Sequence, residues 1–213
     1  MNPFGGWHPI PWDNEEIEVG ATSWAIIALI KAGVSSSSEI IMKAIKWLRD
    51  NQWEDSGGWG RWYNNKKDSI PLIIRTCDAI AALLIADEDP ESPIIQKAID
   101  WLINLQDLVE LEEKSYERGW GWRAFEGEKI AISDVENTSV AINTMLQCIV
   151  NPNSPIITCG IKWLLEKANS ETFWGKDSPR AIICLSRYLN ASTEDCLGYK
   201  SIFAPHLNSE DLY

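Results

Sequence analysis

Few residues of this chain have the type and spacing that chemistry requires. Two carboxylates, Asp134 and Glu136, stand two positions apart in the run DVENT (134–138), just before an apolar segment. On the residues alone, Asp134 is predicted to cap a helix and Glu136 to lie in its first turn, where negative charge is favourable. The histidines are His8 and His206, and the five cysteines form no CxxC pair. We therefore expect reduced, structural thiols, no metal and no cofactor.

Tryptophan is the other unusual component, with 12 Trp against 5 Tyr and 4 Phe. Several of these residues lie in glycine-rich loops. The segment 57–60 (GGWG) follows Gln52, and the segment 119–122 (GWGW) follows Gln106 after an insertion. Glycine permits a tight path, and the indole ring offers a large apolar surface. We expect these tryptophans to pack between neighbouring helical hairpins, with each Gln bonding the end of its own helix or the following loop.

Three segments align without gaps and predict helices of one kind. Apolar residues recur in them at helical spacing, and a serine precedes each one, in the position of an N-cap whose hydroxyl can accept from first-turn amides. Proline at the first helical position of two copies is compatible with that start. The segments are Glu39–Gln52, Pro93–Gln106 and Pro155–Ala168, preceded by Ser38, Ser92 and Ser154.

Four further segments alternate with these and are apolar on most faces. Each contains Thr or Ser followed three residues later by Ala, and small residues are frequent, which is typical of helices buried on more than one side. They are Ala21–Ile30, Arg75–Leu84, Asn137–Leu146 and Ser178–Leu185, with the aligned alanines Ala25, Ala79, Ala141 and Ala181. The sequence thus predicts an all-α repeat in which inner and outer helices alternate.

Composition limits the classes of function. The chain has 213 residues, 45% of them hydrophobic, so we expect a single domain spanning 1–213, with the C-terminal tail 191–213 as one candidate for capping the array and another chain as the alternative. Its net charge of -12 repels phosphate backbones, so no nucleic acid is expected as a partner. No apolar run is long enough to span a bilayer and the N-terminus has no signal-like core, so we expect a cytoplasmic protein with no transmembrane segment.

The glycine–tryptophan loops after Gln, together with the inner segment ATSWAIIALI and the outer segment AIKWLRDNQ, resemble the prenyltransferase and squalene-oxidase repeat. The chain looks most like the C-terminal half of squalene–hopene cyclases, the class II terpene cyclases, whose loops carry the QW-type motif. This resemblance implies an α/α-toroid, here a half-barrel of alternating inner and outer helices. It does not by itself specify the chemistry, because one fold serves several functions.

The resemblance also gives the two carboxylates a catalytic interpretation. Triterpene cyclases carry a DxDD motif before an inner helix, and its middle Asp protonates an alkene or epoxide. DVENT has the same place: Asp134 matches the first acid, Glu136 occupies the proton-donor position, and Asn137 replaces the last Asp. The capping interpretation of Asp134 and Glu136 stays open beside this one. The protein prenyltransferase branch implies a zinc site of Asp, Cys and His, but no histidine accompanies Cys77-Asp78 in an inner segment.

Two hypotheses about function follow. In the first, the inner helices bind an apolar, isoprenoid-type ligand, with Trp24, Trp62 and Trp122 as its aromatic lining and Asp134 and Glu136 as acids of an isomerase that starts cyclisation or isomerisation. In the second, the protein is a non-catalytic scaffold that binds a peptide or a protein. Because the repeats amount to roughly half of the family's ring, a homodimer or a complementary partner is expected to complete it.

Overall fold

The computed structural model describes residues 5–9, 17–61, 70–107, 119–121, 133–170 and 178–192. Apart from isolated bridges such as Gly121 with Ser133, the regular elements in these ranges are helices. They are α1 (Val19–Lys31), α2 (Glu39–Asp50), α3 (Ile73–Ile85), α4 (Pro93–Asp107), α5 (Val135–Gln147), α6 (Pro155–Ser170) and α7 (Ser178–Ala191). The all-α fold predicted from the sequence is confirmed.

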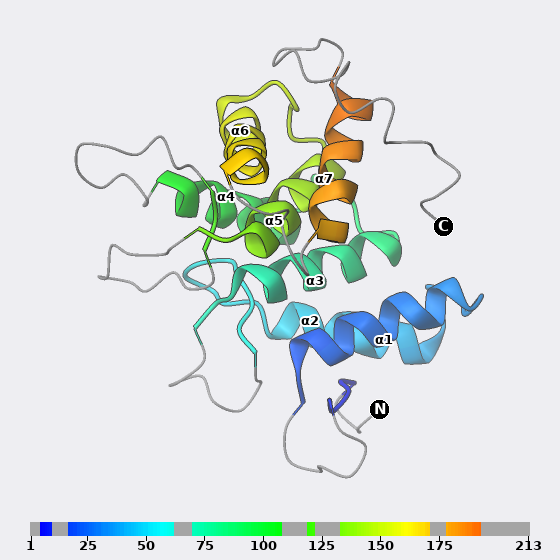
Figure 1. The fold of residues 1–213 in the computed structure, drawn as a ribbon. Coiled ribbons are helices and arrows are strands. Elements are labelled where there is room, and N and C mark those ends of the chain that lie inside the picture. Colours follow the sequence, from blue (N-terminus) through cyan, green and yellow to red (C-terminus); the bar gives the residue numbers. More distant parts are fainter. Residues whose placement is uncertain are drawn as a thin grey trace.

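The helices form two layers (Figure 1). Helices α1, α3, α5 and α7 pack against one another in chain order and make the inner layer. Helices α2, α4 and α6 make the outer layer, each packed on the inner helix that precedes it. This alternation is the arrangement of an α/α-toroid, of which the described helices form a half-barrel. No helix in the described ranges has both the length and the apolarity needed to cross a bilayer.

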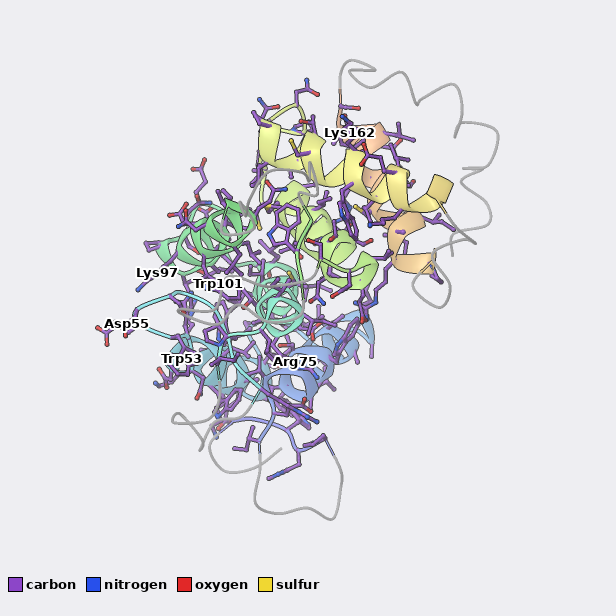
Figure 2. All side chains as sticks on the ribbon, turned by 60° about the vertical axis from the view of Figure 1, so that its left-hand side comes forward. Trp53, Asp55, Arg75, Lys97, Trp101 and Lys162 are labelled. Carbon is purple, nitrogen blue, oxygen red and sulfur yellow. The ribbon has the colours of Figure 1, made fainter. Side chains whose placement is uncertain are left out.

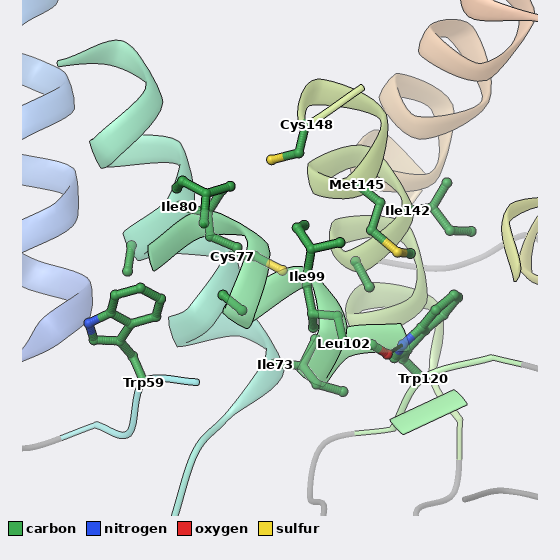
Figure 3. Packing of buried hydrophobic residues seen from close by; sticks show 14 of the residues in the cluster. Trp59, Ile73, Cys77, Ile80, Ile99, Leu102, Trp120, Ile142, Met145 and Cys148 are labelled. Carbon is green, nitrogen blue, oxygen red and sulfur yellow. Dashed lines mark hydrogen bonds between the residues drawn. The ribbon is translucent and has the colours of Figure 1, made fainter. Parts of the chain in front are cut away.

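The hydrophobic core lies between the two layers. Figure 3 shows buried side chains of three successive helices meeting there. They are Ile73, Cys77 and Ile80 of α3, Ile99 and Leu102 of α4, and Ile142 and Met145 of α5. Two loop tryptophans, Trp59 and Trp120, flank this cluster in the same view and are 0% and 1% exposed.

Each of these tryptophans joins an outer helix to the next inner helix. The indole Nε1 of Trp59 donates to the carbonyl of Leu48 near the end of α2 at 2.8 Å, and its backbone N–H donates to Thr76 Oγ1 of α3 at 2.9 Å. Trp120 repeats the pattern, donating to the carbonyl of Leu102 at 2.8 Å and to Thr138 Oγ1 at 2.9 Å. The expected packing of tryptophan between neighbouring hairpins is therefore observed, with specific hydrogen bonds added to it.

The glutamines that precede these loops reach further than the sequence suggested. Gln52 Nε2 donates to the carbonyl of Gly57 in the following loop at 2.8 Å, as expected. The same nitrogen also donates to the carbonyl of Ile94 in the first turn of α4 at 2.8 Å. Gln106 makes the equivalent bond to Ile156 in the first turn of α6 at 3.0 Å. Each glutamine thus bonds the next outer helix.

Glycine is required where the first of these loops meets α4. Gly57 has a φ of +82°, and a Cβ placed there would lie 2.6 Å from the carbonyl oxygen of Lys97. The Lys97 ammonium donates to the carbonyl of Glu54 in the same loop. Figure 2 labels Lys97 and Trp101 of α4 on the same side of the molecule as Trp53 and Asp55 of the loop. The loop therefore packs directly on the backbone of the next outer helix.

The three predicted serine caps do lie at the N-cap positions, but their side chains do not make the predicted capping hydrogen bonds. The backbone carbonyls of Ser38, Ser92 and Ser154 accept from the amides of Met42, Gln96 and Thr158, so each serine does begin its helix. The three hydroxyl oxygens are buried, however, and form no hydrogen bond. Ser38 is in an extended conformation, which the N-cap position requires. The predicted C-terminal tail lies outside the described residues from 193 onward.

Candidate functional site

A cavity of about 310 Å³ opens on the inner face of the half-barrel, and all four inner helices contribute to its wall. Its lining follows the internal repeat. The residue just before each aligned alanine lines the cavity, and so does the residue two positions after it. These residues are Trp24, Asp78, Val140 and Arg180 in the first set and Ile27, Ala81, Asn143 and Ile183 in the second. Positions three apart share a helix face, so one stripe of each inner helix faces the cavity.

Of the three tryptophans predicted to line a ligand site, one can be placed. Trp24 lies in α1, lines the cavity and is 54% exposed. Trp62 and Trp122 fall outside the described residues, so their assignment as ligand-binding residues stays a prediction. Trp24 was the best candidate from the sequence because it alone of the three lies within an inner segment.

The carboxyl group that lines the cavity is Asp78, which the sequence suggested only as a zinc ligand. Asp78 is on α3 and is 6% exposed. Its Oδ2 accepts from Arg75 Nη1 at 3.1 Å, and Arg75 Nη2 also pairs with Glu18 Oε1 at 2.9 Å. The repeat contained a signal for it, because Asp78 is the aligned counterpart of Trp24. Figure 2 shows Arg75 beside α1 and α3, where these contacts occur.

Burial raises the pKa of Asp78 to about 6, against the opposing effect of Arg75 and of the more distant Arg180. Removal of water destabilises the charged form of a carboxyl group, and a nearby cation only partly compensates. Asp78 therefore changes protonation close to neutral pH. A buried carboxyl group that can carry a proton there, in the wall of a cavity, is a candidate acid.

Neither DVENT carboxylate is part of the cavity wall. Asp134 is the N-cap of α5: its Oδ1 accepts from the backbone amide of Asn137 at 2.7 Å and its Oδ2 from Asn137 Nδ2 at 2.8 Å. Glu136 Oε1 lies 3.4 Å from Arg180 Nε, and Arg180 does line the cavity. The capping interpretation of Asp134 thus has direct hydrogen bonds behind it, and the catalytic roles of Asp134 and Glu136 stay predictions.

The thiols in this region have no feature of a reactive or metal-binding site. Cys77 lines the cavity, but burial raises the pKa of its thiol to about 12, so the thiolate is not formed near neutral pH. Across the described ranges, no group of three or more His, Cys, Asp or Glu residues is placed to hold a metal ion. The chemistry available at the cavity is therefore that of a carboxyl group, the Arg180 guanidinium, hydroxyl and amide groups, and apolar contact.

Comparison with known proteins agrees with this architecture. Residues 33–182 match the family model described as the squalene-hopene cyclase C-terminal domain. The squalene–hopene cyclase of Zymomonas mobilis subsp. mobilis is 27% identical over 181 residues, which cover 82% of this chain and 25% of that protein. The squalene–hopene cyclase of Bradyrhizobium diazoefficiens is 25% identical over 146 residues, covering 66% of this chain and 20% of that protein. The chain thus spans a quarter or less of the length of these relatives.

Proposed function

The chain belongs to the family of the squalene-hopene cyclase C-terminal domain, and from this premise we propose that its inner-face cavity binds an apolar, isoprenoid-type ligand. The observation that carries the proposal is the cavity itself, lined at equivalent positions of all four inner helices. Trp24, Ile27, Val140 and Ile183 give it an apolar wall. Its volume of about 310 Å³ lies at the lower end of the range of about 300–1,000 Å³ that is typical of small-molecule sites.

Acid-initiated cyclisation or isomerisation of that ligand requires a protonated carboxyl group that faces it. Asp78 meets this requirement best, because it lines the cavity and is almost fully buried. Both oxygens of Asp134 accept hydrogen bonds from Asn137, which leaves its carboxylate committed to the helix cap. Glu136 pairs with Arg180 and is not among the residues that line the cavity. We therefore assign the acid role to Asp78 ahead of the two DVENT residues.

Turnover and binding test the two parts of this proposal separately. The full chain is incubated with squalene and with shorter polyprenyl substrates, and products are identified by gas chromatography and mass spectrometry. We expect Asp78→Asn to abolish product formation, and Asp134→Asn and Glu136→Gln to retain it. Loss of product in Glu136→Gln with retention in Asp78→Asn would return the acid role to DVENT.

Binding is measured by calorimetric titration with the same ligands. Trp24→Ala is expected to weaken binding, because it removes a large apolar surface from the cavity wall. Met42→Ala is the matched control, since Met42 is also a large exposed side chain, at 59%, but belongs to the outer helix α2. Equal affinities for both variants, or no binding of any polyprenyl compound to the unaltered chain, would refute the binding proposal.

A non-catalytic, partner-binding role is the second candidate, and one observation favours it. Trp24 on α1 and Ile183 on α7 are 54% and 47% exposed on the inner face. Large exposed apolar side chains frequently mark a protein–protein contact. If a second copy packs there, light scattering will give a dimer that Trp24→Asp and Ile183→Asp convert to monomer. A stable monomer of the unaltered chain would remove this candidate.

A further inference from the structure

A loop of the glycine–tryptophan type also precedes the first helix, at residues 5–7, and it packs as the loop before α3 does. Gly5 has a φ of +105°, and a Cβ placed there would lie 2.5 Å from the carbonyl oxygen of Lys43 on α2. This is the close approach that the loop before α3 makes to α4. The backbone N–H of Trp7 donates to Thr22 Oγ1 of α1 at 3.0 Å. Toward the helices that follow it, this loop therefore forms a complete repeat junction.

On its other side, the loop lacks the contacts that complete the later junctions. The indole N–H groups of Trp59 and Trp120 each donate to a carbonyl of the outer helix before the loop, and both side chains are buried. Trp7 is only partly buried, and in the described part of the chain its indole N–H has no hydrogen-bond partner. Among the described helices, none stands before this loop as α2 stands before Trp59. Trp7 thus has the surroundings of one half of a junction.

The first turn of α2 presents a matching acceptor. In the two complete junctions, a glutamine side chain donates to the carbonyl of the second residue of the next outer helix, Ile94 or Ile156. Ile40 is the second residue of α2, and no side chain in the described ranges donates to its carbonyl. Since Gln52 also bonds the first glycine of its loop, the carbonyl of Gly5 is a second acceptor of the same kind. This surface therefore offers one donor and two acceptors.

Those groups match the C-terminal end of an outer helix. Residues 47–52 and 101–106 share the pattern Trp-Leu-x-x-x-Gln. The leucine carbonyl accepts from the indole of the loop, and the glutamine amide donates to the next outer helix. Residues four apart lie about one turn apart on the same face of a helix, so a helical segment presents the two groups together.

The described outer helices of a second copy of this chain do not supply such an end. Helices α2 and α4 use these groups to bond their own loops. Helix α6 has Ala168 where the other two segments have glutamine. The matching helix must therefore come from a different polypeptide.

We propose that the Trp7 face, the surface formed by Gly5, Trp7 and Ile40, binds the C-terminal end of an outer-type helix contributed by a partner polypeptide that carries the same repeat. A carbonyl near the end of that helix accepts from Trp7 Nε1, and a glutamine one turn later donates to the carbonyls of Gly5 and Ile40. The contact continues the repeat interface already present between α2 and the loop of Trp59. Trp7 is not part of the cavity wall, so this contact does not depend on the ligand proposed for the cavity.

A peptide with the sequence of residues 38–52 is the probe, because it is this chain's own outer helix up to the glutamine. The peptide is labelled with fluorescein and titrated with the full chain, and binding is followed by fluorescence anisotropy. Trp7→Phe in the chain removes the indole donor, and Gln52→Leu in the peptide removes the amide donor. We expect saturable binding that each change weakens roughly fivefold, the effect of losing one hydrogen bond. Trp53→Phe, at another partly buried loop tryptophan, is the matched control and should leave the affinity unchanged.

A second measurement is needed because isolated helices shorter than about 12–15 residues are marginal in water. In an extended chain, a copy of residues 38–56 replaces residues 1–4, so the added helix precedes Gly5 in the register that α2 has before Gly57. We expect the extension to raise the midpoint of urea unfolding. Trp7→Phe should lower the midpoint more in the extended chain than in the unaltered one, because only the extension gives the indole N–H an acceptor.

The outcomes decide the proposal as follows. Peptide binding that Trp7→Phe and Gln52→Leu both weaken supports it, and so does a gain in the extended chain that depends on Trp7. Peptide binding that neither change affects would overturn it. Absence of peptide binding, together with an extension that gives no gain or a gain independent of Trp7, would overturn it as well.

Discussion

The internal repeat includes both the loops that join the helical hairpins and the row of residues that faces the cavity. The two regions differ in how far residue types recur from copy to copy. In the loops, residue types and hydrogen bonds recur: a tryptophan amide donates to a threonine hydroxyl in the pairs Trp7–Thr22, Trp59–Thr76 and Trp120–Thr138. In the cavity row, one position holds a different residue in every copy: Trp24, Asp78, Val140 and Arg180. The recurring loop residues hold the two helix layers together, and the varying residues of the cavity row determine the chemistry of the cavity.

The largest expected effect is on the free energy of unfolding, and it distinguishes a tryptophan of the loops from a tryptophan of the cavity row. Trp59→Ala should lower the free energy of unfolding by about 3–5 kcal/mol, because it leaves a cavity in the core and removes the bond to Leu48. Trp24→Ala should change it by less than about 1 kcal/mol, because Trp24 is half exposed. Urea unfolding followed by circular dichroism measures both. Similar losses for the two variants would remove the distinction between loop and cavity positions.

Two glycines with positive φ sharpen the comparison on the loop side. Gly57→Ala should cost about 2 kcal/mol more than Gly33→Ala, because the new methyl group must displace the backbone at Lys97. Gly33 has a φ of +92°, but no atom lies within 4 Å of the place that a methyl group would take there, so its substitution carries only the conformational cost. The same unfolding experiment gives the difference. Equal costs would mean that the loop does not need its close approach to α4.

The pH dependence of stability tests the cavity side. Since the pKa of Asp78 is raised from 3.8 to about 6, the folded state holds a proton that the unfolded state releases, and the contribution of Asp78 to stability falls as pH rises from about 4 to about 6. The difference in unfolding free energy between Asp78→Asn and the unaltered chain should therefore move in favour of the variant by about 2 kcal/mol across this range. A difference independent of pH would mean that the carboxyl group is not buried as described.

The sequence predicted the architecture well because the repeated segments coincide with the alternating inner and outer helices. The helices α2, α4 and α6 begin where the aligned segments do, and α1, α3 and α5 begin two residues before theirs. The start of α5 was predicted by the Asp134 cap, whereas the earlier starts of α1 and α3 were missed because the side chains of their N-cap residues, Glu18 and Leu72, make no capping bond. Their amides donate to the carbonyls of Trp7 and Trp59, a contact between loop and helix that local patterns do not record.

The site was harder to predict for a physical reason. DVENT attracted attention because two acids stand together in the sequence, whereas Asp78 is isolated and depends on three neighbouring helices for its surroundings. The pKa of a carboxyl group is set by burial and by charges brought close through folding, and neither can be read from adjacent residues. Aligning the position before each repeated alanine would have drawn attention to Asp78 without coordinates.

The amide groups of Gln52 and Gln106 have a consequence for how the array melts. Each glutamine can make this hydrogen bond only when the first turn of the next outer helix is folded. The stability of each helical hairpin is therefore coupled to that of its nearest neighbour. Strong coupling of this kind favours a single collective transition over the loss of one hairpin at a time. Hydrogen exchange should accordingly find α2, α4 and α6 opening with similar free energies, as one cooperative unit.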